Sequence, residues 1–95
     1  MATTATPIAY YTKDPDAVLD YNIDWATWLD GDTISTSVWT VPAGLTQDSS
    51  SHADGITTVF LSSGTDGTSY VVKNRIVTAG GRTDDRTISI NVKQR

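Results

Sequence analysis

The sequence contains no cysteine and no glutamate, and a single histidine among its 95 residues. Without cysteine, neither a disulfide framework nor a thiolate metal site can form, so stability has to come from packing or from partners. The net charge of −4 argues against a nucleic-acid groove, which needs clustered Lys and Arg. No apolar run approaches the ~20 residues that span a bilayer, and the N-terminus lacks the basic-then-apolar order of a signal peptide. We therefore expect a soluble product made in a cytosol.

The length and the turn signals indicate one small all-β domain. Ninety-five residues are close to the size of a seven-stranded immunoglobulin-like sandwich. Glycines recur at positions 31, 44, 55, 64, 67 and 80–81, and regular turn signals at such spacing are typical of sandwiches and small barrels. We expect an immunoglobulin-like β-sandwich of about seven strands.

Alternating apolar residues predict most of the strands. Leu19, Tyr21 and Ile23 alternate with polar residues, whereas the stretch 56–61 is apolar on both faces and is expected to be a central strand. In the stretch 33–41 two alternating sets compete, which predicts a bulge near residues 35–37. The expected elements are strands at 18–24, 33–41, 56–61, 70–78 and 88–92, a polar loop at 46–55 and a hairpin turn at 80–85.

Four aromatic residues and one aspartate are expected to define the fold. Tyr70 follows a turn that contains Asp66, and the apolar Val72 lies two residues on, which is the pattern of a tyrosine corner. Trp25 and Trp28 have the spacing of a single helical turn that covers one end of the sandwich. Trp39 is expected to belong to the core or to an end of the sandwich.

The N-terminal residues are expected to differ from the rest of the domain. Residues 1–12 form an N-terminal arm or edge strand, and residues 13–95 form the single sandwich domain. Residues 1–7 are rich in Thr and Ala and are expected to be a loose arm. Residues 8–12, which include Ile8, Tyr10 and Tyr11, are expected to pair as a strand only in the assembled state.

The side chains that could carry chemistry favour a structural role instead. The pairs of aspartates lie beside Pro or Gly, where Asp side chains cap turns, and no Glu is present to complete a calcium loop. His52 lies among polar neighbours without the scaffold and the oxyanion site that a hydrolase needs. The glycine-rich turns are followed by strands, whereas a phosphate loop leads into a helix. We expect no catalytic residue, no cofactor and no metal ligand.

Several exposed positions are candidates for contact with another molecule. Val71 and Val77 are expected on the outward face of their strand, where apolar side chains indicate a covered surface. Arg82 belongs to a possible basic patch beside the last hairpin, although charges that discourage edge-to-edge aggregation would explain it equally well. The three Trp residues also leave open a surface that stacks on sugars.

Ordered blocks of sequence resemble a family of tailed-phage proteins. The blocks include Lys13 to Tyr21, Asp24 to Leu29, Val38 to Val41, Val59 to Gly64, Tyr70 to Ile76 and Arg86 to Ile88. Over roughly residues 13–93 the chain is similar to the fiber–tail adaptor proteins. The resemblance implies a small immunoglobulin-like virion protein that is present in several copies, and it carries no catalytic signature.

These observations predict a non-enzymatic structural protein of a phage virion. The leading expectation is an adaptor that attaches fibers or neighbouring proteins at the tail or at the head–tail junction, with other virion proteins as partners and several copies in a symmetric assembly. A capsid decoration protein and a carbohydrate-binding module are the alternatives. No nucleic acid or membrane is expected as a partner. The predicted interaction residues are Ile8, Tyr10, Tyr11, Val71, Val77 and Arg82.

Overall fold

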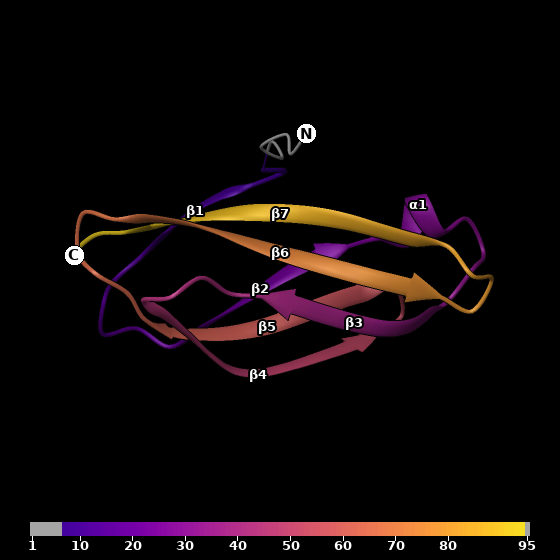
Figure 1. Cartoon of the computed structure of the whole chain (residues 1–95), viewed down its shortest axis with the longest axis horizontal. Helices are drawn as coiled ribbons and strands as arrows, with labels where there is room; N and C mark the ends of the chain where they lie inside the picture. The colour runs from indigo at the N-terminus through magenta and orange to yellow at the C-terminus, as the bar shows by residue number, and fades with distance from the viewer. Residues whose placement is uncertain (1–6, 95) are drawn as a thin grey trace.

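Two β-sheets pack face to face in the computed structural model, which describes residues 7–94 (Figure 1). The four-stranded sheet has the order β1 (Tyr10–Lys13), β7 (Thr83–Val92), β6 (Ser69–Thr78) and β3 (Ile34–Thr40). The three-stranded sheet has the order β2 (Leu19–Asp24), β5 (Ile56–Ser63) and β4 (Leu45–Ala53). The single helical turn α1 (Ala26–Leu29) lies at one end of the sandwich. The all-β, seven-stranded sandwich expected from the sequence is confirmed.

Alternation along the strands produces the core between the sheets. Val59 and Leu61 of β5 face Val72 and Ile76 of β6, and all four side chains are fully buried. Trp25, directly before α1, is the largest of the fully buried side chains. The register between β3 and β6 shifts between Ile34 and Thr36, which confirms the predicted bulge.

A buried polar network joins the two sheets in place of a disulfide bond. The Asn74 Oδ1 atom on β6 accepts hydrogen bonds from Thr57 Oγ1 on β5 at 2.7 Å and from Trp25 Nε1 at 3.1 Å. The Asn74 amide nitrogen donates to Ser37 Oγ at 2.9 Å and to the Val38 carbonyl at 3.2 Å, both on β3. Because both polar atoms of the amide have partners, its complete burial is compatible with stability.

Two arginines of the β6–β7 hairpin hold α1 against the sandwich. The Arg82 guanidinium lies 4.3 Å from the ring centroid of Trp28 and donates to the Leu29 carbonyl at 2.7 Å. Arg86 lies at the same distance from the ring of Trp25. A guanidinium over an indole face contributes ~0.5–2 kcal/mol, depending on its exposure. These contacts stabilise a helical turn that is too short to be stable alone.

Tyr70 has the geometry of a tyrosine corner. Its side chain is buried at the start of β6, and its hydroxyl oxygen accepts a hydrogen bond from the Thr65 backbone N–H at 3.0 Å. Gly44, in the loop between β3 and β4, has a φ angle of +104°, and a Cβ atom there would lie 2.8 Å from Tyr70 Oη. Glycine at position 44 therefore lets the loop close over the ring of Tyr70.

Replacing Gly44 with alanine is expected to destabilise the protein through both conformation and contact. Gly31 provides the matched control, because its φ angle is +89° and a Cβ atom there would meet nothing within 4 Å. We expect Gly31→Ala to lower the free energy of unfolding by about 1–2 kcal/mol. Gly44→Ala should cost about 1–3 kcal/mol more because the Cβ overlaps Tyr70. Urea unfolding of both variants measures the difference, and equal losses would contradict the contact with Tyr70.

The polar loop predicted for residues 46–55 is wrong, because residues 45–53 form strand β4. The strand is joined to β5 by a two-residue turn in which Asp54 and Gly55 have φ angles of +53° and +80°. This Asp-Gly pair is a strong hairpin signal. Every residue of β4 after Leu45 is exposed, so no apolar alternation marks the strand.

The expectation that residues 8–12 pair only in the assembled state is also wrong. β1 pairs in parallel with β7 of the same chain, and the predicted boundary between residues 12 and 13 falls inside β1. The end of β1 is fixed by Lys13, whose fully buried side chain donates to the Ser63 carbonyl at 2.6 Å and to the Asp14 carbonyl at 2.9 Å. Burial lowers the pKa of the Lys13 ammonium. Of the predicted loose arm, residues 1–6 lie outside the described residues.

Candidate interaction surface

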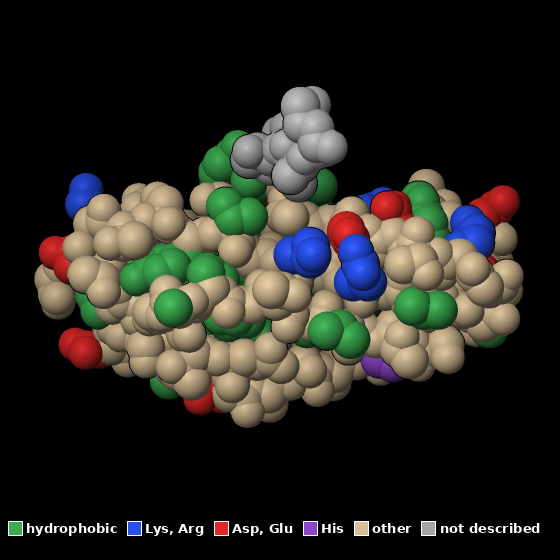
Figure 2. All heavy atoms as spheres, in the orientation of Figure 1, with side chains coloured by type: hydrophobic (Ala, Val, Ile, Leu, Met, Phe, Trp, Pro, Cys, Tyr) green, Lys and Arg blue, Asp and Glu red, His purple; other side chains and the backbone are tan. Residues whose placement is uncertain are grey.

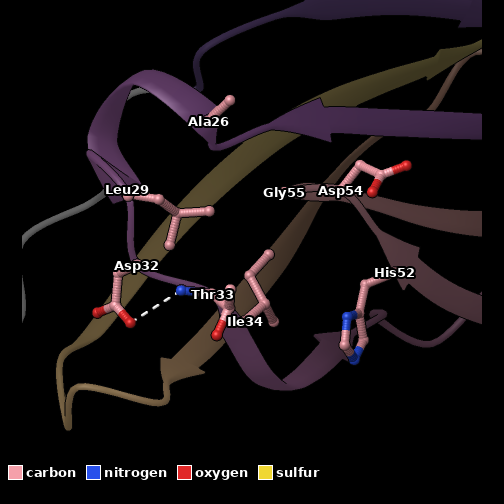
Figure 3. A pocket seen from close by; sticks show the side chains of 9 residues that line it. Ala26, Leu29, Asp32, Thr33, Ile34, His52, Asp54 and Gly55 are labelled. Atoms are coloured by element: carbon pink, nitrogen blue, oxygen red, sulfur yellow. Dashed lines mark hydrogen bonds between the residues drawn. The ribbon is translucent and has the colours of Figure 1, made fainter.

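A cavity of about 370 Å³ opens at the end of the sandwich beside α1 (Figure 3). Leu29 and Ile34 form its apolar wall, and Asp32, His52 and Asp54 lie around it. Asp32 precedes β3, whereas His52 and Asp54 belong to the β4–β5 hairpin, and the three side chains do not point toward one another (Figure 3). Among the described residues, no hydrogen bond joins these three side chains to one another, and Asp32 is bonded instead to Thr33, Gly80 and Arg82.

Within residues 7–94, no three His, Cys, Asp or Glu side chains gather in a way that could hold a metal ion. None of the described helices is long and apolar enough to cross a membrane.

The outer face of the four-stranded sheet presents apolar side chains at neighbouring positions. Tyr10 of β1 and Val71 of β6 both pair with Ser89 of β7, so the three residues form one row across the sheet. Tyr10 is 73% exposed and Val71 is 48% exposed. Ile8 and Val38 are also more than half exposed, and Ile8 donates its backbone N–H to the Thr87 carbonyl of β7. We call these four residues, Ile8, Tyr10, Val38 and Val71, the apolar set of the β1–β7–β6–β3 face.

Polar and charged side chains separate the members of this set. In Figure 2, which shows this side of the molecule, hydrophobic side chains are interrupted by a group of Lys, Arg and Asp side chains. Arg75 and Asp85 form a bidentate ion pair with distances of 2.7 and 3.0 Å. The hydrogen bond from Arg75 holds the pKa of the Asp85 carboxyl below its usual range. Apolar anchors among satisfied polar groups are typical of protein–protein interfaces.

The structure divides the predicted interaction residues into two groups. Ile8, Tyr10, Val71 and Val77 lie on the outer side of the four-stranded sheet, although Val77 is only half exposed. Tyr11 points the other way and packs against the core, with its ring centroid 5.0 Å from that of Tyr21. Arg82 uses its donors on Asp32 and on the Trp28 and Leu29 carbonyls. Tyr11 and Arg82 thus take part in internal contacts, and their role in an interaction stays a prediction. We add Val38, which is 58% exposed and which the sequence pattern did not single out.

The predicted fold-defining residues mostly lie in the interior. Trp25 and Trp39 are buried, and half-buried Trp28 packs edge-on against Trp25 under the Arg82 guanidinium. Because no two indole faces lie together on the described surface, the three Trp residues do not form a platform for sugars. Asp66 accepts a hydrogen bond from the Gln94 backbone N–H at 2.8 Å and so fixes the end of the chain after β7.

Asp32 links the start of β3 to the β6–β7 hairpin. Its carboxylate accepts hydrogen bonds from the Thr33 and Gly80 backbone N–H groups and from Arg82 Nε. A hydrogen bond from the Thr78 hydroxyl, together with these backbone and arginine donors, lowers the pKa of Asp32. These donors favour the ionised form, which is the form present at neutral pH.

The lowered pKa of Asp32 predicts a dependence of stability on acid pH. The unfolded chain binds a proton at Asp32 more readily than the folded chain does, so stability rises with pH in the window between the two pKa values. The contribution is complete above the ordinary Asp pKa of ~3.9 and is lost as the pH falls through the lower folded value. Asp32→Asn should reduce the loss of stability on acidification, measured by urea unfolding at neutral and acid pH. Asp30→Asn, at an exposed neighbouring position, should leave that loss unchanged; an equal effect of both variants would contradict the role of Asp32.

Comparison with models of protein families identifies the family of this chain. The family of the podophage GP4 fiber-tail adaptor protein gp77 matches residues 13–91. The chain belongs to this family. The expected resemblance to fiber–tail adaptors is thereby confirmed, and the family is one of structural proteins of phage particles. No curated protein matches the sequence.

Solved structures share the fold at low sequence identity. The PKD domain of the KIAA 1837 protein has a TM-score of 0.57 and 18% identity, over 97% of this chain and 85% of that one. Titin domain M7 has a TM-score of 0.60 and 11% identity, over 93% of this chain and 89% of that one. A 2,6-sialyltransferase from Vibrionaceae Photobacterium sp. has a TM-score of 0.53 and 11% identity, over 98% of this chain but only 19% of the enzyme. These similarities establish the immunoglobulin-like sandwich fold and give no information on function.

Proposed function

We propose that this protein is a non-enzymatic adaptor that attaches fibers to the tail of a podophage particle. The family match over residues 13–91 carries this proposal, because it spans nearly the whole sandwich. The proposal places the protein in the virion, in several copies, in contact with other tail or fiber proteins. Repeated weak contacts in a symmetric assembly give durable attachment through effective concentration.

The β1–β7–β6–β3 face is the proposed contact with the first of these partners. Three members of its apolar set lie in β1, β3 and β6, and Ile8 is bound to β7 through its backbone, so the contact positions are fixed by a hydrogen-bonded sheet. Burial of apolar area contributes ~25 cal/mol per Å², and four partly exposed side chains of this size are enough to anchor a contact within a larger interface. The half-exposed Val77 extends the same face toward the hairpin.

Assembly of particles with variant chains tests this function. Phage particles produced with Tyr10→Asp and Val71→Asp together should contain much less of the chain than wild-type particles, because two charges would be buried in the contact. Ala43→Asp, which adds a charge at an exposed loop position, is the control and should be incorporated normally. Thermal unfolding of the purified variants should match that of the wild type. Normal incorporation of the double variant would refute the proposal that this face is a contact surface. An image of the particle with the chain on the capsid would show that the protein is a decoration protein and not a tail adaptor.

A further inference from the structure

The outer face of the three-stranded sheet has an unusual distribution of apolar residues. In central strand β5, Thr57, Val59 and Leu61 point inward and are fully buried. On the opposite side of the same strand, Ile56 is 39% exposed and Phe60 is 40% exposed. A sheet that faces water on one side normally alternates apolar and polar residues along each strand. The second apolar side of β5 is therefore a surface that another molecule can cover.

The strand register places a carboxylate beside each of these apolar residues. Asp20 of β2 pairs with Phe60, and Asp24 of β2 pairs with Ile56. On the β4 side, the neighbours of Phe60 and Ile56 are the small residues Ser49 and Ala53. On the β2 side, each exposed apolar residue of β5 thus has a carboxylate as its direct neighbour, whereas on the β4 side its direct neighbour is small. We call Asp20, Asp24, Ile56 and Phe60 the acidic stripe.

Within residues 7–94, no Lys or Arg forms an ion pair with the carboxylates of the acidic stripe, and Arg86 donates only to the backbone carbonyl of Asp24. Residues 14–72, which include β2, β4 and β5, contain no Lys and no Arg, whereas all acidic residues except Asp84 and Asp85 lie in this stretch. Asp24 accepts a hydrogen bond from the Ala26 backbone N–H. The carboxylate of the exposed Asp20 has no hydrogen-bond or ion-pair partner within residues 7–94. The Asp20 carboxylate consequently presents unpaired negative charge beside Phe60, its neighbour on β5.

We propose that the acidic stripe docks an arginine-bearing apolar surface of a second virion protein. Arginine fits both parts of the stripe, because its planar guanidinium stacks on an aromatic ring and pairs with a carboxylate in two-point geometry. In this pose an arginine of the partner lies over Phe60 and donates to Asp20. The chain already uses arginine in this way, since Arg82 and Arg86 each lie 4.3 Å from a tryptophan ring.

A second copy of this chain does not fit the acidic stripe. Each chain has a net charge of −4, so two copies repel each other. In addition, the arginines of the described part of the chain already have partners, because Arg75 pairs with Asp85, Arg82 with Asp32, and Arg86 donates to the Asp24 carbonyl. The occupant is therefore a different protein of opposite charge.

This inference rests on the proposed adaptor function and gives it a second contact. The two sheets face opposite directions, so a partner on the acidic stripe leaves the β1–β7–β6–β3 face free for another partner (Figure 1). An adaptor that joins a fiber to a tail needs two such independent surfaces. Positive charge on the partner would also speed its encounter with the stripe at low ionic strength.

Asp20→Lys is the decisive variant, because the Asp20 carboxylate has no partner within the described residues. The Asp24 carboxylate, in contrast, also accepts a hydrogen bond from the Ala26 backbone N–H of α1. Tails and fibers from particles assembled without this chain are mixed separately with the purified protein. Binding is then measured between ~50 mM and ~500 mM NaCl, a range over which exposed charges become screened. We expect Asp20→Lys to weaken binding to one of the two components about tenfold or more at low salt, with the other unchanged. The wild-type affinity for that component should fall with salt toward the affinity of the variant.

Two further variants make the outcome unambiguous. Asp16→Lys has the same charge change at an exposed turn position and should bind both components as the wild type does. Phe60→Ser should lose affinity for the same component as Asp20→Lys, with a melting temperature close to that of the wild type. If Asp20→Lys and Phe60→Ser both retain wild-type binding, the docking at the acidic stripe is refuted while the adaptor function stands. If the wild-type chain binds neither tails nor fibers, the adaptor function and this inference both fall.

Discussion

Replacing Asn74 with alanine is expected to lower the free energy of unfolding by about 3–5 kcal/mol. The substitution removes the shared acceptor of Thr57 Oγ1 and Trp25 Nε1 and the donor to Ser37. Each buried polar group that loses its partner costs ~1–3 kcal/mol, and the missing amide also leaves a cavity. Because small domains are stable by only ~5–15 kcal/mol, the variant should be marginally folded.

Asn91 provides a matched control for Asn74. It lies on the neighbouring strand β7, is exposed, and accepts a single long hydrogen bond of 3.3 Å from the Ser69 hydroxyl. Asn91→Ala should change the free energy of unfolding by less than about 0.5 kcal/mol. Denaturant unfolding of both variants measures the contrast. Losses of similar size in the two variants would show that the network at Asn74 does not stabilise the fold.

Replacing Trp25 with alanine is also expected to lower the free energy of unfolding by about 3–5 kcal/mol, mainly because it leaves a cavity in the core. Trp25 is the largest fully buried side chain, and its ring contacts both Trp28 and Arg86. Its loss opens the largest cavity that a single substitution in this core can make and removes the support of α1. Trp28→Ala, at a half-buried position, should cost clearly less.

A double variant separates the contribution of Trp25 from that of Asn74. Since Trp25 Nε1 donates to Asn74 Oδ1, the two single losses share an interaction. The loss of stability in the double variant should therefore be smaller than the combined losses of the single variants, by about 0.5–3 kcal/mol. The measurement is a double-mutant cycle by chemical denaturation. Fully additive losses would mean that the indole N–H and the amide are energetically independent.

The strands that sequence patterns predict are those whose apolar side chains alternate. In β6, Tyr70, Val72 and Ile76 are buried as expected, because a sandwich core selects one face of each strand. The apolar residues on both sides of β5 were equally visible in the sequence. The second apolar side of that strand, which carries Ile56 and Phe60, lies on the outer surface of the three-stranded sheet.

Strand β4 could not be recognised from alternating apolar residues. Its residues after Leu45 are polar or small and are exposed on both sides, so the strand is held by its backbone pairing with β5 and not by side-chain burial. A hairpin signal was nevertheless present in the Asp54-Gly55 pair, whose positive φ angles suit a tight turn between antiparallel strands.

The burial of Lys13 had no local signal at all. A lysine beside Asp and Pro is normally assigned to a solvated turn, because lysine is among the residues that are most rarely buried. Its main partner is the carbonyl of Ser63, which is 50 residues away in the sequence. Only the packing of the two sheets brings that carbonyl to the ammonium group, so the contact is a property of the fold and not of the segment.

The parallel pairing of β1 with β7 has a mechanical consequence. Although these strands lie near opposite ends of the chain, they run in the same direction, and the Lys93 backbone N–H continues the pairing by donating to the Lys13 carbonyl at 2.9 Å. A pull applied between the two ends would drag one strand lengthwise along the other. The backbone hydrogen bonds between the two strands would then be loaded in shear at the same time, and they would not break one after another. In the adaptor function proposed above, tension would be carried along the strongest direction of the sheet.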